Sequence, residues 1–253
     1  MSDDRLVEDT LLHNVNEKVI HCKVCPRLTK YIKEVGRTRT NKFMNQVYWA
    51  KPVPTFGDPK AGLLVIGLAP AAHGGNRTGR IFTGDSSGDW LVRALFETGF
   101  ANKPTSVSRD DGLILKDAYL TGAVRCAPPL NKPDGSEISN CSQYLLAETK
   151  ILEKTTKVIL VLGKIAFDAY CKVCNVRGLR FGHNKIYPMH DGKTMIISYH
   201  PSRRNTNTGT LTWPMWINIF KMARSIINGG GRNGYEVGER RIFCLGYDIL
   251  YIV

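Results

Sequence analysis

The chain has few acidic residues for its size and no long hydrophobic run. Its 253 residues include 22 Asp and Glu against 35 Lys and Arg, so the formal net charge is +13. Such an excess is typical of proteins with an anionic partner, and nucleic acid is the first candidate. No apolar run approaches the roughly 20 residues that span a bilayer, and no N-terminal segment has the pattern of an export signal. We therefore expect a cytoplasmic protein with no membrane partner.

The seven cysteines lack the context of a secreted disulfide framework, so we expect metal ligands, core residues or redox groups. Cys22 and Cys25 form a Cys-x2-Cys pair, and Cys126 follows a predicted strand. With Cys141 they make four thiols, which suit a [4Fe–4S] cluster and also tetrahedral zinc. Cys141 also lies on an apolar helical face, so a place in the core stays open for it.

Three further cysteines have no assigned role. Cys171 and Cys174 form a second Cys-x2-Cys pair, which could replace one of the pairs above, form a redox disulfide or pack in the core. Cys244 has no partner by spacing, and we expect it to behave as a small buried hydrophobic residue.

Apolar runs alternate with helical patterns from about residue 60 onward. Short runs rich in branched residues predict buried strands, and the patterns between them predict helices. The predicted strands are 63–68, 118–124, 157–162 and 194–199, and the predicted helices are 89–97, 137–154, 165–171 and 214–227. This order predicts an α/β fold in which helices cover both faces of a parallel sheet.

The flanking segments have weaker patterns. Residues 5–21 have the apolar spacing of an amphipathic helix, and the basic, Pro-containing stretch 27–60 predicts an extended loop region. Residues 228–234 are Gly-rich and resemble a flexible linker before a short apolar tail. We therefore expect one domain over residues 1–228, followed by a linker and tail over residues 229–253.

Three predicted strands end in segments with unusual residues. Because ligands bind beyond the carboxyl ends of parallel strands, these segments are expected to share one rim of the sheet. They are 67–85, 124–133 and 200–205. The first contains two glycines with the spacing of a phosphate-binding loop, but Asp85-Ser86 follows instead of Lys-Ser/Thr, which argues against a nucleoside triphosphate site.

His200 begins the last of these segments. A lone histidine is more often structural, yet this one lies beside two arginines and a proline that stiffens the turn, so a functional role is equally open. The hydroxyl, guanidinium and amide groups that follow are the kinds that contact DNA. These candidate DNA contacts are Ser202, Arg203, Arg204 and Asn205.

Together these segments resemble the uracil-DNA glycosylase superfamily, and most closely its iron–sulfur type-B branch, family 5. The resemblance runs from Cys22 to about Phe220. It rests on Cys22-x2-Cys25-Pro26, Gly67-Leu-Ala-Pro-Ala-Ala-His-Gly-Gly-Asn-Arg-Thr-Gly79, Phe82-Thr-Gly-Asp85, Val124-Arg-Cys-Ala-Pro-Pro, Asn131-Lys-Pro, Cys141, and His200-Pro-Ser with Asn205-Thr-x-Thr-Gly209.

The resemblance implies a three-layer α/β/α sandwich around a central four-stranded parallel sheet. It also implies that Cys22, Cys25, Cys126 and Cys141 hold a structural [4Fe–4S] cluster rather than zinc. The implied activity is that of a monofunctional DNA glycosylase in base excision repair, which flips uracil out of DNA and hydrolyses its N-glycosidic bond to leave an abasic site. We expect a monomer that acts on double-stranded DNA, with single-stranded DNA as a further candidate.

Two residues depart from sister families. Those families carry an acidic residue or Asn where this chain has Leu68, and a base-reading Asn where it has Gly122. The type-B branch is thought to use an aspartate further along, which corresponds to Asp85. We therefore expect a looser choice of base, with hypoxanthine and other deaminated bases as further substrates.

The resemblance also implies roles for the rim residues. Asp85 would orient the attacking water and offset the positive charge on the sugar, while His200 would hydrogen-bond the departing carbonyl oxygen. Asn131 is the third catalytic candidate. The candidate contacts to the base are Phe82, which would stack on it, and the amides of Ala71 and Ala72.

Other classes of protein remain as alternatives. A non-catalytic iron–sulfur nucleic-acid-binding protein would need the charge and the cluster but no acid at Asp85. A zinc-stabilised nucleotide-binding protein would be colourless. A bifunctional lyase would need an amine such as Lys132, and we expect simple hydrolysis instead.

Overall fold

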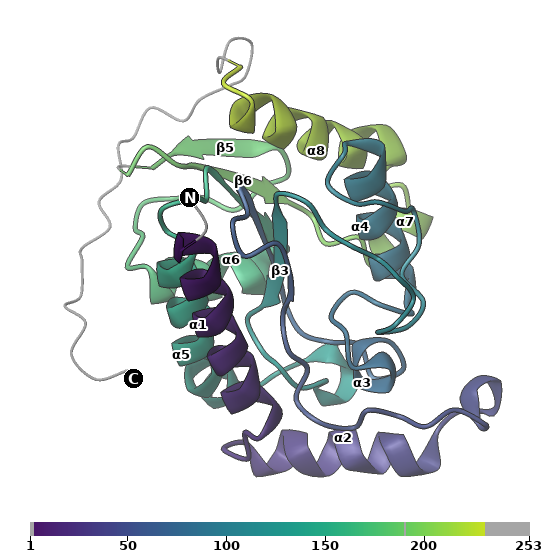
Figure 1. Ribbon diagram of the computed structural model, residues 1–253. Coiled ribbons are helices and arrows are strands. Elements are labelled where there is room, and N and C mark those ends of the chain that lie inside the picture. The colour runs from purple at the N-terminus through teal and green to yellow at the C-terminus, as the bar shows by residue number, and fades with distance from the viewer. Residues whose placement is uncertain (1–2, 190, 231–253) are drawn as a thin grey trace.

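Three layers build the molecule, with a sheet between two layers of helices (Figure 1). The computed structural model describes residues 3–189 and 191–230. The sheet has six strands in the order β1-β3-β2-β4-β6-β5; the middle four are parallel, and each edge strand is antiparallel to its neighbour. In chain order they are β1 (Phe56–Gly57), β2 (Leu63–Gly67), β3 (Ala118–Gly122), β4 (Val158–Leu162), β5 (Lys185–Pro188) and β6 (Thr194–Ser198).

The sequence-based expectation of a four-stranded parallel sheet is correct only for the centre of the sheet. The four predicted strands are present as β2, β3, β4 and β6, but two antiparallel strands extend the sheet at its edges. The sequence pattern misses β1 because that strand has only two residues. It misses β5 because an edge strand is partly exposed and lacks a continuous apolar run.

The helices divide between the two faces of the sheet. One core lies between the sheet and α4 and α8, and the other lies between the sheet and α1, α5 and α6 (Figure 1). Every residue of the four central strands is buried, as expected of strands covered on both faces. The helices are α1 (Asp3–Ile20), α2 (Pro26–Thr38), α3 (Gly75–Thr78), α4 (Ser86–Glu97), α5 (Gly135–Ile151), α6 (Lys164–Val173), α7 (Arg203–Asn207) and α8 (Trp213–Ile227), with 3-10 turns η1 (Asn41–Phe43) and η2 (Pro129–Asn131).

The expected extended loop over residues 27–60 is wrong in its first part, because Pro26–Thr38 forms the helix α2. Its buried residues Leu28, Ile32 and Val35 have helical spacing, and Pro26 suits the first helical position because its missing N–H has no intrahelical partner there. The many basic residues of this stretch lie on the exposed face and mask the apolar stripe. From Arg39 to Thr55 the chain contains only the short turn η1.

The connections around β2 define where a ligand site can form. The chain leaves β2 through α3 and α4, on one face of the sheet, whereas it leaves the neighbouring strands β3 and β4 through α5 and α6, on the other face. In open α/β sheets a crevice forms where neighbouring connections diverge in this way. The carboxyl end of β2, at Gly67, therefore lies at such a crevice.

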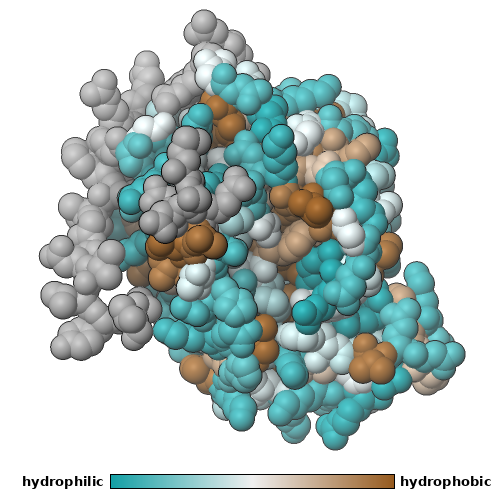
Figure 2. All heavy atoms as spheres, viewed as in Figure 1, coloured by the Kyte–Doolittle hydropathy of each residue, from teal (hydrophilic) through white to brown (hydrophobic). Residues whose placement is uncertain are grey.

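Part of the sequence-based description falls outside these residues. The expected apolar tail, Cys244 and most of the Gly-rich linker lie beyond residue 230. None of the described helices combines the length and apolar character needed to span a membrane. On the face seen in Figure 2, hydrophilic residues cover most of the coloured surface, and hydrophobic residues form small separate patches.

Candidate active site

Asp85 caps the N-terminus of α4 at the end of the first rim segment. Its Oδ1 accepts hydrogen bonds from the backbone N–H groups of Ser87 and Gly88, both at 3.0 Å. Within the described residues, its second oxygen, Oδ2, has no hydrogen-bond donor. The helix terminus therefore stabilises the ionised carboxylate and leaves one oxygen available for water or substrate.

Gly74 lets the backbone of the rim segment approach that free oxygen. A Cβ atom on residue 74 would collide with Oδ2 of Asp85, so only glycine fits here. Arg77 then ties the loop on both sides of this contact, because its guanidinium donates to the carbonyl of His73 at 2.8 Å and to that of Gly84 at 3.2 Å. The position of Asp85 is thus fixed by the loop as well as by the helix.

His200 follows β6 and lies beside Asp85. The Ser87 hydroxyl donates to the carbonyl of Pro201 at 3.0 Å, which ties the start of α4 to the His200 segment. Burial lowers the pKa of His200, and the nearby Asp85 carboxylate opposes this shift. The imidazole is therefore neutral at neutral pH and can act as an uncharged hydrogen-bond donor.

Phe82 closes the crevice at the end of β2. Its backbone has a left-handed conformation with φ of 50°, which is uncommon for a bulky residue and aims the ring across the strand end. A Cβ atom on Gly67 would collide with the tip of the ring, so the ring lies directly against the backbone of β2. Phe82 is buried, with 8% of its surface exposed, so only part of the ring is open to a base.

Leu68 and Gly122, the two departures expected from the sequence, also lie at these strand ends. Leu68 directly follows β2, and its carbonyl accepts the N–H of Val124 at 2.8 Å. Gly122 ends β3, and a Cβ atom there would come within 3.3 Å of the Ile81 side chain. The carbonyl of Val124 is equally close, at 3.3 Å, so a side chain larger than hydrogen would be crowded at residue 122.

The amides of Ala71 and Ala72 lie in the same loop, and both residues are half-buried. The carbonyl of Ala71 accepts the N–H groups of Gly74 and Asn76, which folds the loop into a tight turn. Asn76 is fully buried, and its amide donates to the carbonyls of Ile32 in α2 and of Ala72. The helix α2 therefore holds the loop of the candidate base contacts in place through this hydrogen bond to Ile32.

Asn131 makes no hydrogen bond to the acid or the histidine among the described residues. It ends η2 as an exposed residue with φ of 56°, next to Leu130 with φ of 54°. Two successive left-handed residues are strained, and such strain is found at functional turns more often than elsewhere.

The four candidate DNA contacts form the start of the short helix α7. Ser202 caps this helix, and Arg203 donates to the hydroxyl of Ser86 at 3.2 Å. Asn205 turns inward, since its amide donates to the carbonyl of His200 at 2.9 Å. Arg204 is exposed. The structure therefore leaves the arginines at the surface and uses Asn205 to shape the turn after His200.

The first cysteine pair and the two later cysteines come together although they are distant in sequence. Cys25, Cys126 and Cys141 pack in one buried cluster with Leu28 and Ile32 of α2. Cys22 lies close enough to perturb both Cys126 and Cys141 electrostatically. Ala69 and Ala72 of the rim loop pack against the same cluster, so the cysteines lie directly beneath the candidate site.

Burial raises the pKa of the Cys141 thiol to about 11 and raises that of Cys126 further. Without a bound cation these thiols therefore stay protonated at neutral pH. In residues 3–189 and 191–230, no three His, Cys, Asp or Glu side chains are arranged to hold a single metal ion. Cys171 and Cys174 pack against the other core, beside α6, and so do not replace either member of the first pair.

A buried ion pair lies next to these thiols. Arg125 donates to Glu148, which also accepts a hydrogen bond from Thr121 at 2.6 Å. Both charged residues have at most 1% of their surface exposed. The Nε and Nη1 atoms of Arg125 have no hydrogen-bond partner among the described residues. Since a buried unpaired donor is costly, these N–H groups mark a place where an acceptor is missing.

Sequence reasoning missed the residues that hold the site together. Ser87, Arg77 and Gly74 were inside or beside the first motif but received no role, although their geometry fixes Asp85. Tyr48 was also missed; its hydroxyl lies 3.0 Å from Nδ1 of His73. A hydroxyl residue two positions after a helix-capping aspartate was the available signal for Ser87, whereas nothing local marks Tyr48.

Comparison with known proteins agrees with this geometry. The sequence model of the uracil DNA glycosylase superfamily matches residues 54–221. A type-5 uracil-DNA glycosylase of Thermus thermophilus is 45% identical over 81% of this chain and 93% of its own length. That of Pyrobaculum aerophilum is 44% identical over 81% and 89%, whereas a type-4 uracil-DNA glycosylase of the same organism is 28% identical over 87% and 94%.

The family model covers the sheet from before β2 to the middle of α8, and thus every rim segment. Identity to the two type-5 relatives, at 45% and 44%, is well above the 28% identity to the type-4 relative. The chain therefore belongs to the uracil-DNA glycosylase superfamily and, within it, to the type-5 uracil-DNA glycosylases.

Proposed function

We propose that this protein excises uracil from DNA in base excision repair, by hydrolysis of the N-glycosidic bond. One observation carries the proposal: the carboxylate of Asp85 is held by two helix N–H groups, keeps one oxygen free and lies beside a neutral, partly buried histidine. Such a pair can stabilise both charges that develop when the bond breaks. The family membership and the type-5 relatives support uracil as the base.

Asp85 acts on the sugar side of the reaction. As the bond to the base lengthens, positive charge builds on the sugar, and the fixed carboxylate offsets it. The free oxygen Oδ2 orients a water molecule, whose oxygen bonds to the anomeric carbon and whose proton passes to the carboxylate. The electron pair of the broken bond leaves with the base, which then takes a proton from solvent.

His200 acts on the base side. A neutral imidazole donates one N–H to the carbonyl oxygen of the departing base, where negative charge develops, and a preorganised donor of this kind contributes about 3–4 kcal/mol. Phe82 forms the floor under the flipped base, with the amides of Ala71 and Ala72 near its edge. Asn131, whose side chain is exposed, is the third residue assigned to the base.

DNA binds to the surface around Arg203 and Arg204, with the segment Ser202–Asn205 next to the lesion. Arg203 and Arg204 contact phosphates, and Asn205 holds the turn that presents His200. Leu68 and Gly122, at the ends of β2 and β3, offer no polar side chain that could select one base edge. We therefore include hypoxanthine and other deaminated bases among the substrates.

Cys22, Cys25, Cys126 and Cys141 hold a [4Fe–4S] cluster in this proposal. The shared burial of Cys25, Cys126 and Cys141, with Cys22 nearby, supports this assignment, and the four thiolates would be the ligands of the cluster. The unpartnered Nε and Nη1 atoms of Arg125 fit a negatively charged acceptor at this place. The bound cluster would cross-link α2 to the domain and take no part in bond cleavage.

The deciding experiment measures base release from matched duplexes that carry uracil, hypoxanthine, xanthine or a mismatched thymine. We expect release of uracil by the unmodified protein and its loss in His200→Ala, while DNA binding is retained. His21→Ala serves as the control, because His21 is exposed on the last turn before α2. Failure of the unmodified, cluster-containing protein to release uracil from any duplex would refute the proposal.

A further inference from the structure

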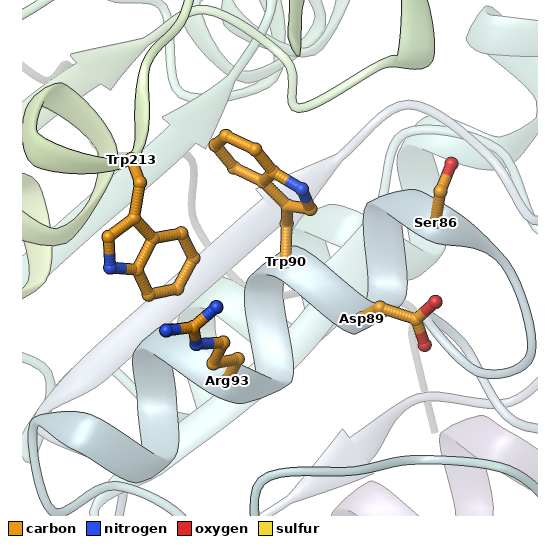
Figure 3. Close-up of a pocket in the computed structure, with 5 residues that line it drawn as sticks. All are labelled: Ser86, Asp89, Trp90, Arg93 and Trp213. Atoms are coloured by element: carbon orange, nitrogen blue, oxygen red, sulfur yellow. The ribbon is translucent and has the colours of Figure 1, made fainter. Parts of the chain in front are cut away.

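A groove between α4 and α8 has no part in the proposed reaction. It has a volume of about 370 Å³ and is open to solvent. Figure 3 shows its lining: Trp90 and Arg93 of α4 lie beside Trp213 at the start of α8, and Ser86 and Asp89 lie farther along α4. The lining residues are Ser86, Asp89, Trp90, Arg93 and Trp213.

Two tryptophans form the apolar wall of this groove. The rings of Trp90 and Trp213 meet edge to face with their centres 5.3 Å apart. Trp90 is fixed from behind, because the indole N–H of the buried Trp216 donates to its carbonyl at 3.0 Å. Both rings are only half-buried, so a flat group can lie against them. Arg93 lies 4.3 Å above the Trp213 ring and adds a second flat, positively charged surface.

The polar residues restrict what this groove can bind. Asp89 is exposed on the lining, and its carboxylate disfavours phosphate at this place. A carboxylate and the Ser86 hydroxyl can instead accept and donate hydrogen bonds at the edge of a nucleobase, whose amino groups pair well with Asp. Flat aromatic rings, one guanidinium and polar groups that can bond to the edge of a base are together typical of a base-stacking site.

The groove begins where the proposed reaction takes place. Ser86 is the residue after Asp85, and its hydroxyl accepts the hydrogen bond from Arg203 of the proposed DNA-binding segment. From Ser86 to Arg93 the groove follows two turns of α4, roughly 10 Å at the helical rise. That length accommodates one base of a strand that leaves the active site.

We propose that this groove binds an unpaired nucleobase of the DNA strand next to the lesion. The base must be unpaired, because both faces of a paired base are covered by its neighbours in the duplex stack. The proposal rests on the proposed function for the identity of the polymer, and it adds a second stacking site outside the pocket for the excised base. It gives the protein affinity for single-stranded DNA without uracil.

The test is the affinity of the cluster-containing protein for a fluorescent single-stranded oligonucleotide that contains no uracil, measured by anisotropy. Trp213→Leu removes the aromatic face, and we expect roughly tenfold weaker binding. Trp213→Phe keeps a ring and is expected to lose less than threefold. Arg93→Gln is expected to weaken binding more than Arg177→Gln, a matched loss of one exposed charge away from the groove.

Uracil release from duplex DNA is measured with the same variants and separates this inference from the proposed function. Weaker binding by Trp213→Leu supports the groove even if no uracil is released, because the oligonucleotide contains none. Unchanged binding by both Trp213→Leu and Arg93→Gln overturns the groove even if the unmodified protein is active. If Trp213→Leu fails to fold, the comparison of Arg93→Gln with Arg177→Gln decides alone.

Discussion

Asp85 combines two roles that substitution can separate. Asn caps helices as well as Asp does, whereas Ala does not. We expect Asp85→Asn to keep the free energy of unfolding within a few tenths of a kcal/mol and Asp85→Ala to lower it by about 1 kcal/mol. Both variants should release uracil at least roughly 100-fold more slowly, because both lack the charge. Chemical denaturation and single-turnover release measure the two effects.

If Asp85 takes part in the reaction, the free energy of unfolding and the rate of uracil release must change independently of each other. If the rate of Asp85→Asn stays near that of the unmodified protein, the carboxylate is only a cap. DNA affinity is the further control, since neither variant changes the basic surface. A loss of affinity as large as the loss of rate would remove Asp85 from the reaction.

His200 determines the acid side of the pH profile. Because burial lowers its pKa, the imidazole stays neutral below pH 6.5, the ordinary value for histidine. We therefore expect the single-turnover rate to show no inflection near pH 6.5 and to fall only under more acidic conditions, where the neutral donor is protonated. Rate constants measured from pH 5 to pH 8 on one duplex test this expectation, and an inflection centred at pH 6.5 contradicts it.

At the scale of elements, the four cysteines support the loop of residues 67–85 through the helix α2. Asn76 bonds to the carbonyl of Ile32, and Arg27 forms a two-pronged ion pair with the buried Glu137 at the start of α5. These contacts join α2 to the loop on one side and to α5 on the other. We therefore expect a change at the four cysteines to reach the loop of the candidate base contacts through the packing of α2.

Removal of the proposed cluster should loosen these elements together. We expect Cys126→Ser to abolish visible absorbance and to increase hydrogen exchange in residues 26–38 and 71–79, because α2 loses its cross-link. Cys174→Ser is the matched control, since Cys174 packs in the other core, and its absorbance should match that of the unmodified protein. Loss of colour only in Cys174→Ser, or bound zinc in a colourless unmodified protein, would refute the cluster assignment.

At the scale of the whole molecule, the formal charge of +13 acts on DNA as a long-range attraction. We expect the logarithm of the binding constant for duplex DNA to fall linearly with the logarithm of salt concentration. Arg203→Gln and Arg204→Gln should each reduce this slope by about 1, since each removes one phosphate contact. Arg177→Gln should leave the slope unchanged. A slope that neither arginine alters would place the DNA elsewhere on the surface.

The fold itself followed from sequence pattern wherever burial is continuous. The four central strands and most helices were predictable because apolar runs and helical spacing record burial on one or two faces. The pattern failed at β1, at β5 and in α2, where a strand is too short, an edge is exposed or a basic face masks a narrow apolar stripe. Local sequence carries little information in those three cases.

The sequence by itself determined the residue types of the site, the order of the motifs and the positive charge, because these are properties of the chain rather than of its shape. Only the tertiary structure decided that Ser87 joins α4 to Pro201, that Asn76 joins its loop to Ile32 of α2, and that Arg125 has unpartnered donors. These facts depend on packing between segments far apart in the chain. Spacing along a sequence does not record such distances.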